Sequence, residues 1–515
     1  MEQVNIQPET IARQKSRIFT SSGIVSVCGI VYQVLYGAAG SYLFGNSTLF
    51  YCLTIGFFLS GMGIGAYISE WFKKELLSTF IYTEYLIALI GGCSITGVFF
   101  MQAYFGDDLA KLFLYVVIIV TGMLTGLELP LLIRKSEEID ANLQQSTAKV
   151  LFFDYAGSLI GTVAFAFLLR PWLGLIQTAF FISIINILVA IWLSFVFKKE
   201  VNQRFHRTIG FSVLVLLVFG LLFGEKYATG LEQKLYQDPI IFQEDTEYQR
   251  IVMTKRPGDL RLYLDGQLQF AESDEYRYHE GLVHIPMSLA SKRDSVLVLG
   301  GGDGLAVREL LKYNDVKEIT VVDLDPAMID LAKNNALLRQ LNEDAFSNPL
   351  VKIKNEDAFS FLKNTTETYD VMIIDLPDPN NEALNKLYTW EFYSLVRNAL
   401  TPEGITSIQS TSPVFAREAF WTINETVNHV GLQTASYHID IPSFGNWGFT
   451  LASRAPIETS KIDITVETSY LTNSLVPALF QFGKDEDDSF TENLKPNSLN
   501  RPILLDYYEK AWKYY

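Results

Sequence analysis

The sequence has few of the residues that build metal centres or disulfide frameworks. Its 515 residues include three cysteines and five histidines. The cysteines, Cys28, Cys52 and Cys93, all lie in apolar stretches and form neither a disulfide framework nor a metal-ligand spacing. The histidines stand at positions 206, 279, 284, 429 and 438. They show no metal-ligand pattern either, so we expect no metal site.

Positive charge is also scarce. The chain has 41 lysines and arginines against 57 aspartates and glutamates, which gives a net charge of −16. This sign argues against nucleic acid as a partner, because the nucleic acid backbone is itself negative. It suits a cationic small molecule, although acidity alone is usually only a solubility feature.

Long apolar runs fill the first half of the chain. Most reach the ~20 residues that cross the hydrocarbon core of a membrane. We therefore predict a polar tail over 1–20 and an α-helical polytopic membrane domain over 21–226 with about seven spans. The apolar segments are 21–43, 48–69, 79–104, 112–133, 150–169, 174–197 and 209–224. No small-residue cleavage site follows the first segment, so no removable signal peptide is expected.

Lysine and arginine flank alternate ends of these segments. Basic clusters lie near 13–17, 73–74, 134–149 and 198–207, whereas the loops near 44–47 and 105–110 are nearly free of them. The positive-inside rule places the N-terminal tail in the cytoplasm. Seven true spans would then place the second half of the chain on the outside.

The predicted spans also contain or border three acids, Glu84, Glu128 and Asp154. Acids in a membrane are costly and are therefore candidates for function. An equally weighted interpretation is that they are buried hydrogen-bond partners or interfacial residues. Glycines at helix-packing spacing predict close helix contacts at two pairs, Gly61 with Gly65 and Gly157 with Gly161.

Strand and helix patterns alternate in the second half. Residues 227–285 predict a linker and a small β subdomain, because 240–270 contains short strands with turns. Residues 286–455 predict a Rossmann-like, doubly wound and largely parallel α/β sheet. Its predicted strands are 295–300, 318–325, 351–357, 369–375, 404–410 and 448–453. Residues 456–515 form a C-terminal extension, which we interpret as a solvated surface segment.

Acids follow several of these strands, at the edge where such sheets bind ligands. They are Asp303, Asp323, Asp357 and Asp375. The glycine loop Gly300–Gly304 lets the backbone approach a ligand, and Asp323 stands where an acid binds ribose hydroxyls. This pattern indicates a nucleoside ligand, which could be NAD or S-adenosylmethionine. The structural alternative is that the glycines only form a tight turn between a strand and a helix. The carboxylate of Asp303 disfavours a pyrophosphate and suits a sulfonium or an amine.

Asp375 and Asp378 give the sharpest chemical signal. They stand three residues apart in a loop with Pro377 and Pro379, directly after a strand. A primary amine has a pKa near ~10.4, so it arrives charged and must lose a proton before it attacks. Two carboxylates here predict a site that holds a diamine and accepts its proton. Metal binding is the rival hypothesis, and a helix N-cap is weaker because the prolines favour an extended loop.

At this point the sequence resembles the spermidine synthases, the polyamine aminopropyltransferases, in its membrane-bound bacterial branch. The resemblance extends from about Tyr248 to Ser453. Its blocks are Tyr248-Gln249, Leu264 to Gln269, Asp274 to Glu280, the glycine loop, and Asp375 to Pro379. It implies transfer of an aminopropyl group from decarboxylated S-adenosylmethionine to putrescine, which yields spermidine and methylthioadenosine. No prosthetic group is implied.

The resemblance also implies roles for individual residues. Asp375 would accept the proton, and Asp303 would meet the amine of the aminopropyl group. The nucleoside would be held by Gly300, Gly302, Gln249, Asp323, Asp357 and Ala358. The polyamine site would be formed by Tyr278, His279, Asp378, Gln269 and Gln409. Three departures leave the core acids intact: Asn380-Asn381-Glu382 replaces a Gly-Pro pair, Phe444 replaces a tyrosine, and Asp323 replaces the commoner glutamate.

Two other functions remain open at this stage. One is a methyltransferase, which would not need the Asp375–Asp378 pair. The other is a polyamine sensor or transporter with a silent domain, which the acids in the spans motivate. The donor is made in the cytosol, so we expect an inner-membrane protein with a cytoplasmic catalytic domain. Either one segment, most plausibly 209–224, does not cross, or the charge rule misleads. The expected partners are the two small substrates, the lipid bilayer and, since soluble members commonly form dimers or tetramers, further copies of this chain.

Overall fold

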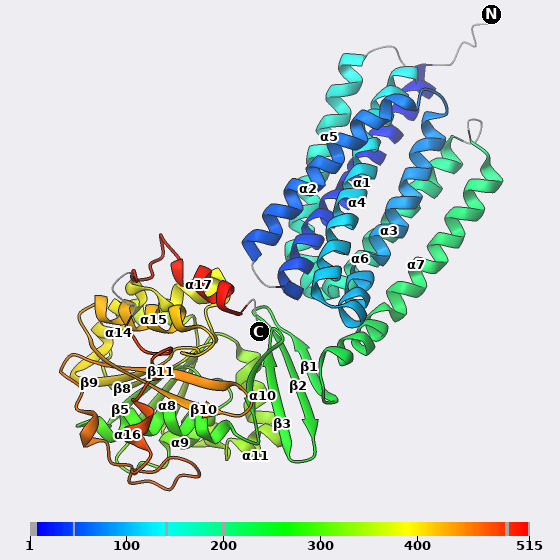
Figure 1. Cartoon of the computed structure of the whole chain (residues 1–515). Helices are drawn as coiled ribbons and strands as arrows, with labels where there is room; N and C mark the ends of the chain where they lie inside the picture. The colour runs from blue at the N-terminus through cyan, green and yellow to red at the C-terminus, as the bar shows by residue number, and fades with distance from the viewer. Residues whose placement is uncertain (1–7, 45–46, 140–142, 198–200, 490–493, 513–515) are drawn as a thin grey trace, which may run out of the picture. The chain divides into compact units, whose positions relative to one another are not determined.

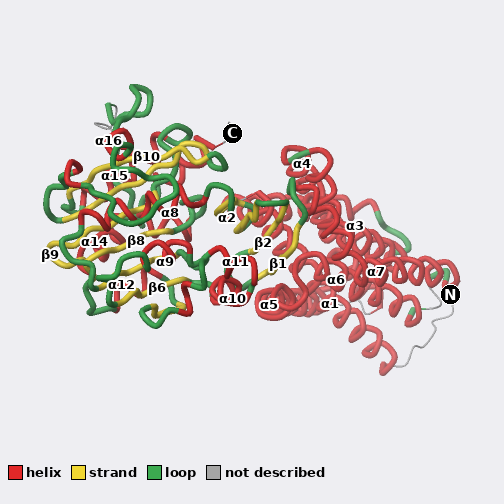
Figure 2. The backbone as a smooth tube through the Cα atoms, turned by 90° about the horizontal axis from the view of Figure 1, so that it is seen from below, coloured by secondary structure: helices red, strands yellow, loops and turns green. Residues whose placement is uncertain are grey.

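The structure is a computed structural model that describes residues 8–44, 47–139, 143–197, 201–489 and 494–512. The chain forms two compact units, Met1–Gln237 and Asp238–Tyr515. The first is helical, whereas the second mixes strands with helices (Figure 2).

The first unit is a bundle of long helices that run side by side (Figure 1). They are α1 (Pro8–Phe44), α2 (Ser47–Ile68), α3 (Leu76–Phe105), α4 (Asp107–Ile139), α5 (Leu143–Ala164), α6 (Arg170–Val196) and α7 (Gln203–Glu232). Helix α1 packs against α2, α4, α5 and α6, while α3 packs against α4, α6 and α7. Lipid can solvate the apolar side chains that remain exposed on the outside of such a bundle.

Six helical stretches among the described residues are long and apolar enough to cross a membrane. One of them, Gln144–Val196, has 53 residues and includes α5 and α6. At ~1.5 Å per residue this length exceeds twice the ~30 Å of a bilayer core. The chain leaves helical geometry within it at Gly174, where φ is 64° and ψ is −169°, a conformation open only to glycine. This stretch therefore has the length and the break for two crossings, in line with the predicted count of about seven. The segment 209–224 lies within α7 and is one of the six.

The predicted close helix contacts are confirmed. A β-carbon added at Gly65 of α2 would overlap the carbonyl oxygen of Met123 in α4, and one added at Gly157 of α5 would overlap that of Gly23 in α1. Gly126 of α4 lies equally close to Met62 of α2, so the approach of α2 and α4 is reciprocal. These glycines let the helix backbones touch.

The second unit contains two sheets. The predicted β subdomain is an antiparallel sheet in the order β1 (Ile240–Asp245), β2 (Arg250–Arg256), β3 (Asp259–Leu264) and β4 (Gln267–Ala271). The larger sheet has the order β10-β11-β9-β8-β5-β6-β7. Its strands are β5 (Ser295–Gly300), β6 (Glu318–Asp323), β7 (Val351–Asn355), β8 (Tyr369–Asp375), β9 (Leu400–Gln409), β10 (Gln433–Ile441) and β11 (Gly445–Ser453). The five strands from β9 to the edge strand β7 are parallel as predicted. Strand β10, which the sequence did not reveal, and β11 are antiparallel.

Helices cover the larger sheet and connect its strands. They are α8 (Glu275–Leu289), α9 (Leu305–Leu310), α10 (Pro326–Asn334), α11 (Ala336–Leu341), α12 (Ala358–Asn364), α13 (Glu382–Asn385), α14 (Trp390–Ala399) and α15 (Arg417–His429). The neighbouring strands β5 and β8 end at Gly300 and Asp375, which are paired in the sheet register. This pairing brings the glycine loop and the acidic loop together.

The prediction for 456–515 was wrong in part, because this extension is not a solvated segment throughout. It includes α16 (Val476–Leu479) and α17 (Ile503–Trp512). The side chains of Leu471, Leu504 and Tyr508 are buried in the cores of the second unit. Apolar side chains spread over a long stretch gave no single periodic run, so the sequence concealed this packing.

Candidate active site

The glycine loop lies directly against the end of β8. The N–H of Gly301 donates to the carbonyl oxygen of Asp375 at 3.2 Å, and a β-carbon at Gly300 would overlap that oxygen. Gly300 and Gly301 have φ values of 80° and 64°, in the left-handed region that favours glycine. The local sequence is thus required for this close approach.

Asp323 ends β6 beside the same loop. A β-carbon at Gly302 would lie 2.6 Å from Asp323 Oδ2, and the N–H of Asp325 donates to Oδ1 at 2.9 Å. Burial raises the pKa of Asp323 to about 6, and the nearby charges of Asp325 and Asp303 add to the rise. The predicted nucleoside residues Gly300, Gly302 and Asp323 therefore share one edge of the sheet.

Gln249, also predicted for the nucleoside, lies just before β2 and reaches this edge through Asp325. Its Nε2 donates to Asp325 Oδ2 at 2.9 Å, and the Thr246 hydroxyl donates to the same oxygen at 2.8 Å. Asp325 also caps α10 by accepting from the N–H of Ala327. The β subdomain and the large sheet are thus joined where the site lies.

Asp303 lies in the glycine loop and is half-buried. Its Oδ1 accepts a hydrogen bond from the N–H of Leu305 at 2.9 Å, and its carbonyl oxygen accepts one from Asn342 Nδ2 at 2.8 Å. Burial raises the pKa of this carboxyl, and the opposite charge of His279 acts against the rise. The loop therefore presents a fixed acid.

Asp375 is the last residue of β8. The Tyr278 hydroxyl donates to its Oδ1 at 2.6 Å. Burial raises the pKa of Asp375 to about 6, and the charge of Asp303 adds to the rise, while His279 and the Tyr278 hydrogen bond oppose it. The ring of Tyr278 packs against Phe449 and Phe444, with centroids 5.3 and 6.3 Å away.

Asp378 follows in the loop and is held by three side chains. Gln409 Nε2 donates to its Oδ1 at 2.7 Å, the Thr411 hydroxyl donates to its Oδ2 at 3.0 Å, and the Tyr508 hydroxyl lies close enough to lower the pKa of this carboxyl. Burial raises the pKa of Asp378 to about 6 against the effect of these donors. Thr411 has a φ of 58°, a strained conformation for a β-branched residue and one that concentrates at functional sites.

His279 belongs to a buried chain of charges on α8 and α9. Its Nδ1 lies 2.8 Å from Glu275 Oε2, and Arg308 donates to both oxygens of Glu275 at 2.8 and 3.0 Å. Arg308 also pairs with Glu309, which contacts His284. Burial disfavours the charged imidazole, but Glu275 outweighs it and raises the pKa of His279 to about 9. His279 is therefore positively charged at neutral pH.

Three of the predicted site residues make their contacts away from the acids described above. Asp357 caps α12 through the N–H of Ser360 and forms an ion pair with Lys386 at 2.7 Å, whereas Ala358 begins that helix and is buried. Burial works against ionisation of Asp357, yet Lys386 and Ser360 lower its pKa overall. Gln269 of β4 donates to the carbonyl oxygen of Gln267, rather than to any of the acids above.

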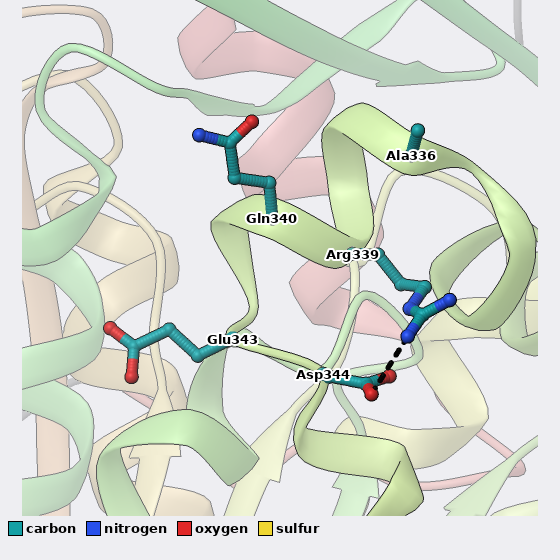
Figure 3. Close-up of a pocket in the computed structure, with 5 residues that line it drawn as sticks. All are labelled: Ala336, Arg339, Gln340, Glu343 and Asp344. Atoms are coloured by element: carbon teal, nitrogen blue, oxygen red, sulfur yellow. Dashed lines mark hydrogen bonds and ion pairs between the residues drawn. The ribbon is translucent and has the colours of Figure 1, made fainter.

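A separate hollow lies at α11 and the turn that follows it (Figure 3). It is lined by Ala336, Arg339, Gln340, Glu343 and Asp344, with an Arg339–Asp344 ion pair of 2.9 Å. None of the acids described above lines it, and it is open rather than enclosed. We therefore place the candidate active site at the ends of β5, β6 and β8.

These positions together make an acidic, largely enclosed site with the imidazole of His279 beside the acids. Among the described residues, no group of three His, Cys, Asp or Glu side chains is arranged to hold a metal ion. The acids suit ligands that bring positive charge, and Asp375 can exchange a proton close to neutral pH. The arrangement fits two cationic ligands that meet between Asp303 and Asp378.

Comparison with known proteins identifies the family. Residues 275–462 match the spermine/spermidine synthase domain. The chain is 52% identical over 505 residues to the polyamine aminopropyltransferase of Oceanobacillus iheyensis, which covers 98% of this chain and 99% of the relative. The chain belongs to the polyamine aminopropyltransferases. The enzyme of Leptospira interrogans with the same name is 37% identical over 97% of this chain and 99% of its own length.

A solved spermidine synthase in complex with the transition state analogue AdoDATO is also similar. It is 28% identical, with a TM-score of 0.45, and the match covers 47% of this chain and 85% of that chain.

Several residues of this aminopropyltransferase site were not predicted from its sequence. Glu275 contacts His279 and is itself paired with Arg308. Thr411 donates to Asp378, and Asp325 accepts from Gln249. Glu275 lies inside the block Asp274 to Glu280, which was the available signal. Tyr508 lies beyond the end of the matched domain at residue 462, so no motif pointed to it.

Proposed function

We propose that the enzyme is a spermidine synthase that uses decarboxylated S-adenosylmethionine as donor and putrescine as acceptor. The observation that carries this proposal is the pair of acids Asp375, which is half-buried, and Asp378, which is buried. Neither has an ion-pair partner among the described lysines and arginines. A diamine supplies the missing positive charge. Unpaired buried carboxylates are otherwise costly.

The donor would lie along the glycine loop. Gly300 and Gly302 allow close approach, Asp323 and Gln249 face the nucleoside, and the Asp357-Ala358 pair borders it. Asp303 would then meet the amine of the aminopropyl group. This order follows the edge of the sheet from β7 to β5.

The acceptor would lie between Asp375 and Asp378. Its distal ammonium would bind Asp378, beside Gln409, while Tyr278, His279 and Gln269 would border the rest of the site. The near amine would face Asp375, which takes its proton. The nitrogen lone pair then forms a bond to the aminopropyl carbon, the carbon–sulfur bond breaks, and sulfur keeps its electron pair as methylthioadenosine.

The rate would come from alignment and from deprotonation of the amine. Tyr278 holds the carboxylate of Asp375 in place by its 2.6 Å hydrogen bond. The positive charge of His279 favours the ionised form of Asp375, which is the form that accepts a proton. Both residues therefore support the base without needing to contact the reacting carbon.

The test is methylthioadenosine release by purified full-length protein with decarboxylated S-adenosylmethionine and a panel of amines. We expect putrescine to give the highest kcat/KM. Release with a different amine alone would overturn the acceptor assignment and keep the aminopropyl transfer. Absence of release with every amine would overturn the proposal.

We also propose that the enzyme is a multi-pass protein of the inner membrane with its catalytic unit in the cytosol, where the donor is made. The basic loops of the helical unit favour the other side when seven segments cross, so a direct test is needed. Lys461 is exposed, and a K461C variant in which Cys28, Cys52 and Cys93 are replaced by serine can be labelled only there by a membrane-impermeant maleimide. Labelling only after cells are permeabilised supports the cytosolic side, whereas labelling of intact cells overturns it.

A specific observation favours a second function, the binding of an ammonium group by the helical unit. Glu84 of α3 and Asn186 of α6 are fully buried, and Asn186 Nδ2 donates to the Glu84 carbonyl oxygen at 3.3 Å. No hydrogen bond of good geometry reaches either carboxylate oxygen of Glu84 or Oδ1 of Asn186, although the side chains of Asn186 and Glu128 lie close to the Glu84 carboxyl group. Three open acceptors match the three N–H donors of a primary ammonium. Glu128 of α4, also buried, places a second carboxyl group beside Glu84.

This second proposal is tested by equilibrium dialysis with radiolabelled putrescine. The D378N background weakens the catalytic site, so binding that remains reports on the helical unit. We expect E84Q to abolish it and E70Q, a change at an exposed acid of the same unit, to preserve it. Equal putrescine binding by the E84Q and E70Q variants of D378N would overturn the proposal. So would the absence of binding by D378N itself.

A further inference from the structure

The C-terminal helix α17 is fastened to the catalytic core although it lies outside the matched family domain. Asn497 is fully buried, and its Nδ2 donates to Asn385 Oδ1 and to the Tyr388 carbonyl oxygen, both at 3.0 Å. Its Oδ1 accepts from the N–H of Leu504 in the first turn of α17 at 3.3 Å. One amide thus connects α17 to the segment that follows the acidic loop.

The same segment holds the acidic loop itself. The Tyr388 hydroxyl donates to the carbonyl oxygens of Leu376 and Pro377, at 3.1 and 3.0 Å. These two residues lie between Asp375 and Asp378. The position of α17 and the position of the two acids are therefore set by one group of contacts.

Tyr508 extends from α17 to Asp378. Its side chain is 7% exposed, and its hydroxyl lies close enough to the Asp378 carboxyl to lower the pKa of that acid. Its ring packs on Trp512, with centroids 5.9 Å apart, and Trp512 packs in turn on Phe415 and Trp447 at 5.6 and 6.5 Å. An aromatic group therefore covers the end of the site where Asp378 lies.

The other two donors to Asp378, Gln409 and Thr411, come from the central sheet and the loop after it. Like the Thr411 hydroxyl, and unlike the Gln409 amide nitrogen, the Tyr508 phenol keeps oxygen lone pairs for a further donor when it donates its only proton. The N–H groups of an ammonium on Asp378 are donors without acceptor capacity. Tyr508 and Asp378 can thus share one ammonium.

We infer that Tyr508 is a substrate-binding residue that helps to select the acceptor amine, and that α17 forms the wall of the acceptor end of the site. This inference rests on the proposed function for the identity of the acceptor. Loss of a hydrogen bond at a charged group commonly lowers affinity by about tenfold. The effect should fall on the acceptor and spare the donor.

The experiment compares Y508F with Y507F, the neighbouring tyrosine on the same helix. Steady-state kinetics give KM for each substrate, and calorimetric titration with putrescine in the presence of methylthioadenosine gives Kd without turnover. We expect Y508F to raise the acceptor KM and Kd by about tenfold while the donor KM changes less than twofold. Y507F should match the unmodified enzyme.

Equal acceptor constants in Y508F and Y507F would overturn the inference. So would a parallel rise of both KM values, because this is the result of a structural defect alone. Should the unmodified enzyme bind putrescine but not convert it, the proposed reaction fails while the titration still tests Tyr508. The two failures are therefore distinguishable.

Discussion

The Tyr278 hydroxyl donates a 2.6 Å hydrogen bond to Asp375 Oδ1. This bond connects α8, the first helix after the β subdomain, to the end of the central strand β8. The Tyr278 side chain is buried. A hydrogen bond to the ionised form favours that form. The contact therefore keeps Asp375 a better proton acceptor than burial alone would allow.

Replacing Tyr278 by phenylalanine should shift the acid limb of the pH–rate profile to higher pH. The hydroxyl lowers the pKa of Asp375, so its loss raises that pKa and leaves less ionised base at pH 7. We expect kcat to fall several-fold at pH 7 and to recover in part at pH 8.5. The measurement is kcat against pH for Y278F and for the control Y276F, and identical profiles would contradict this role.

Replacing Asp375 by asparagine should remove the base. General base catalysis commonly contributes ~10²–10⁴-fold, so kcat should fall at least ~100-fold while the thermal midpoint stays close to that of the unmodified enzyme. Methylthioadenosine release gives the rate. D330N changes an exposed acid on α10 and serves as control. Retention of more than a tenth of the activity by D375N would show that another group takes the proton.

The pH dependence of the unmodified enzyme should reflect the buried acids. Burial raises the pKa of both Asp375 and Asp378 to about 6. Each must be ionised to act, so kcat/KM should rise with pH and lose activity as pH falls through about 6. Rates from pH 5 to 8 test this, with the amine concentration corrected for its own ionisation. A midpoint near ~4, the value of an ordinary carboxyl, would contradict the burial argument.

Replacing Gly65 by alanine should destabilise the helical unit. The new methyl group would overlap the Met123 carbonyl oxygen, and such overpacking costs about 1–3 kcal/mol. Gly63 lies on the same helix and faces open space, so G63A is the matched control. Thermal unfolding in detergent should show a lower midpoint for G65A only. Equal midpoints would mean that α2 and α4 can move apart without loss.

Much of the site was predictable because its parts are local in sequence. Strands are short apolar runs, and the acids Asp323 and Asp375 come at their ends, where parallel strands share an edge. The glycine loop is equally local, since its positive φ values and its approach to β8 need glycine at fixed positions. A pattern read along the chain therefore placed the central acids on one edge of the sheet.

The remaining parts depend on contacts between distant segments. Tyr508 reaches Asp378 only because Asn497 fastens α17, and the Arg308–Glu275 pair forms only after α8 and α9 pack together. Gln269 matches a motif, yet its side chain bonds within its own strand. No periodicity or spacing predicts such pairings, because they are set by how the elements pack.

The raised pKa values of Asp323, Asp375 and Asp378 also couple the site to solvent protons. Near pH 6 these acids are partly protonated when no ligand is bound. A cationic ligand binds best when the acids are ionised. Arrival of a polyamine therefore expels protons, and affinity rises with pH across this range. The buffer takes up the released protons, so the measured enthalpy of binding will depend on the ionisation enthalpy of the buffer. The number of protons released then measures how much of the site is occupied.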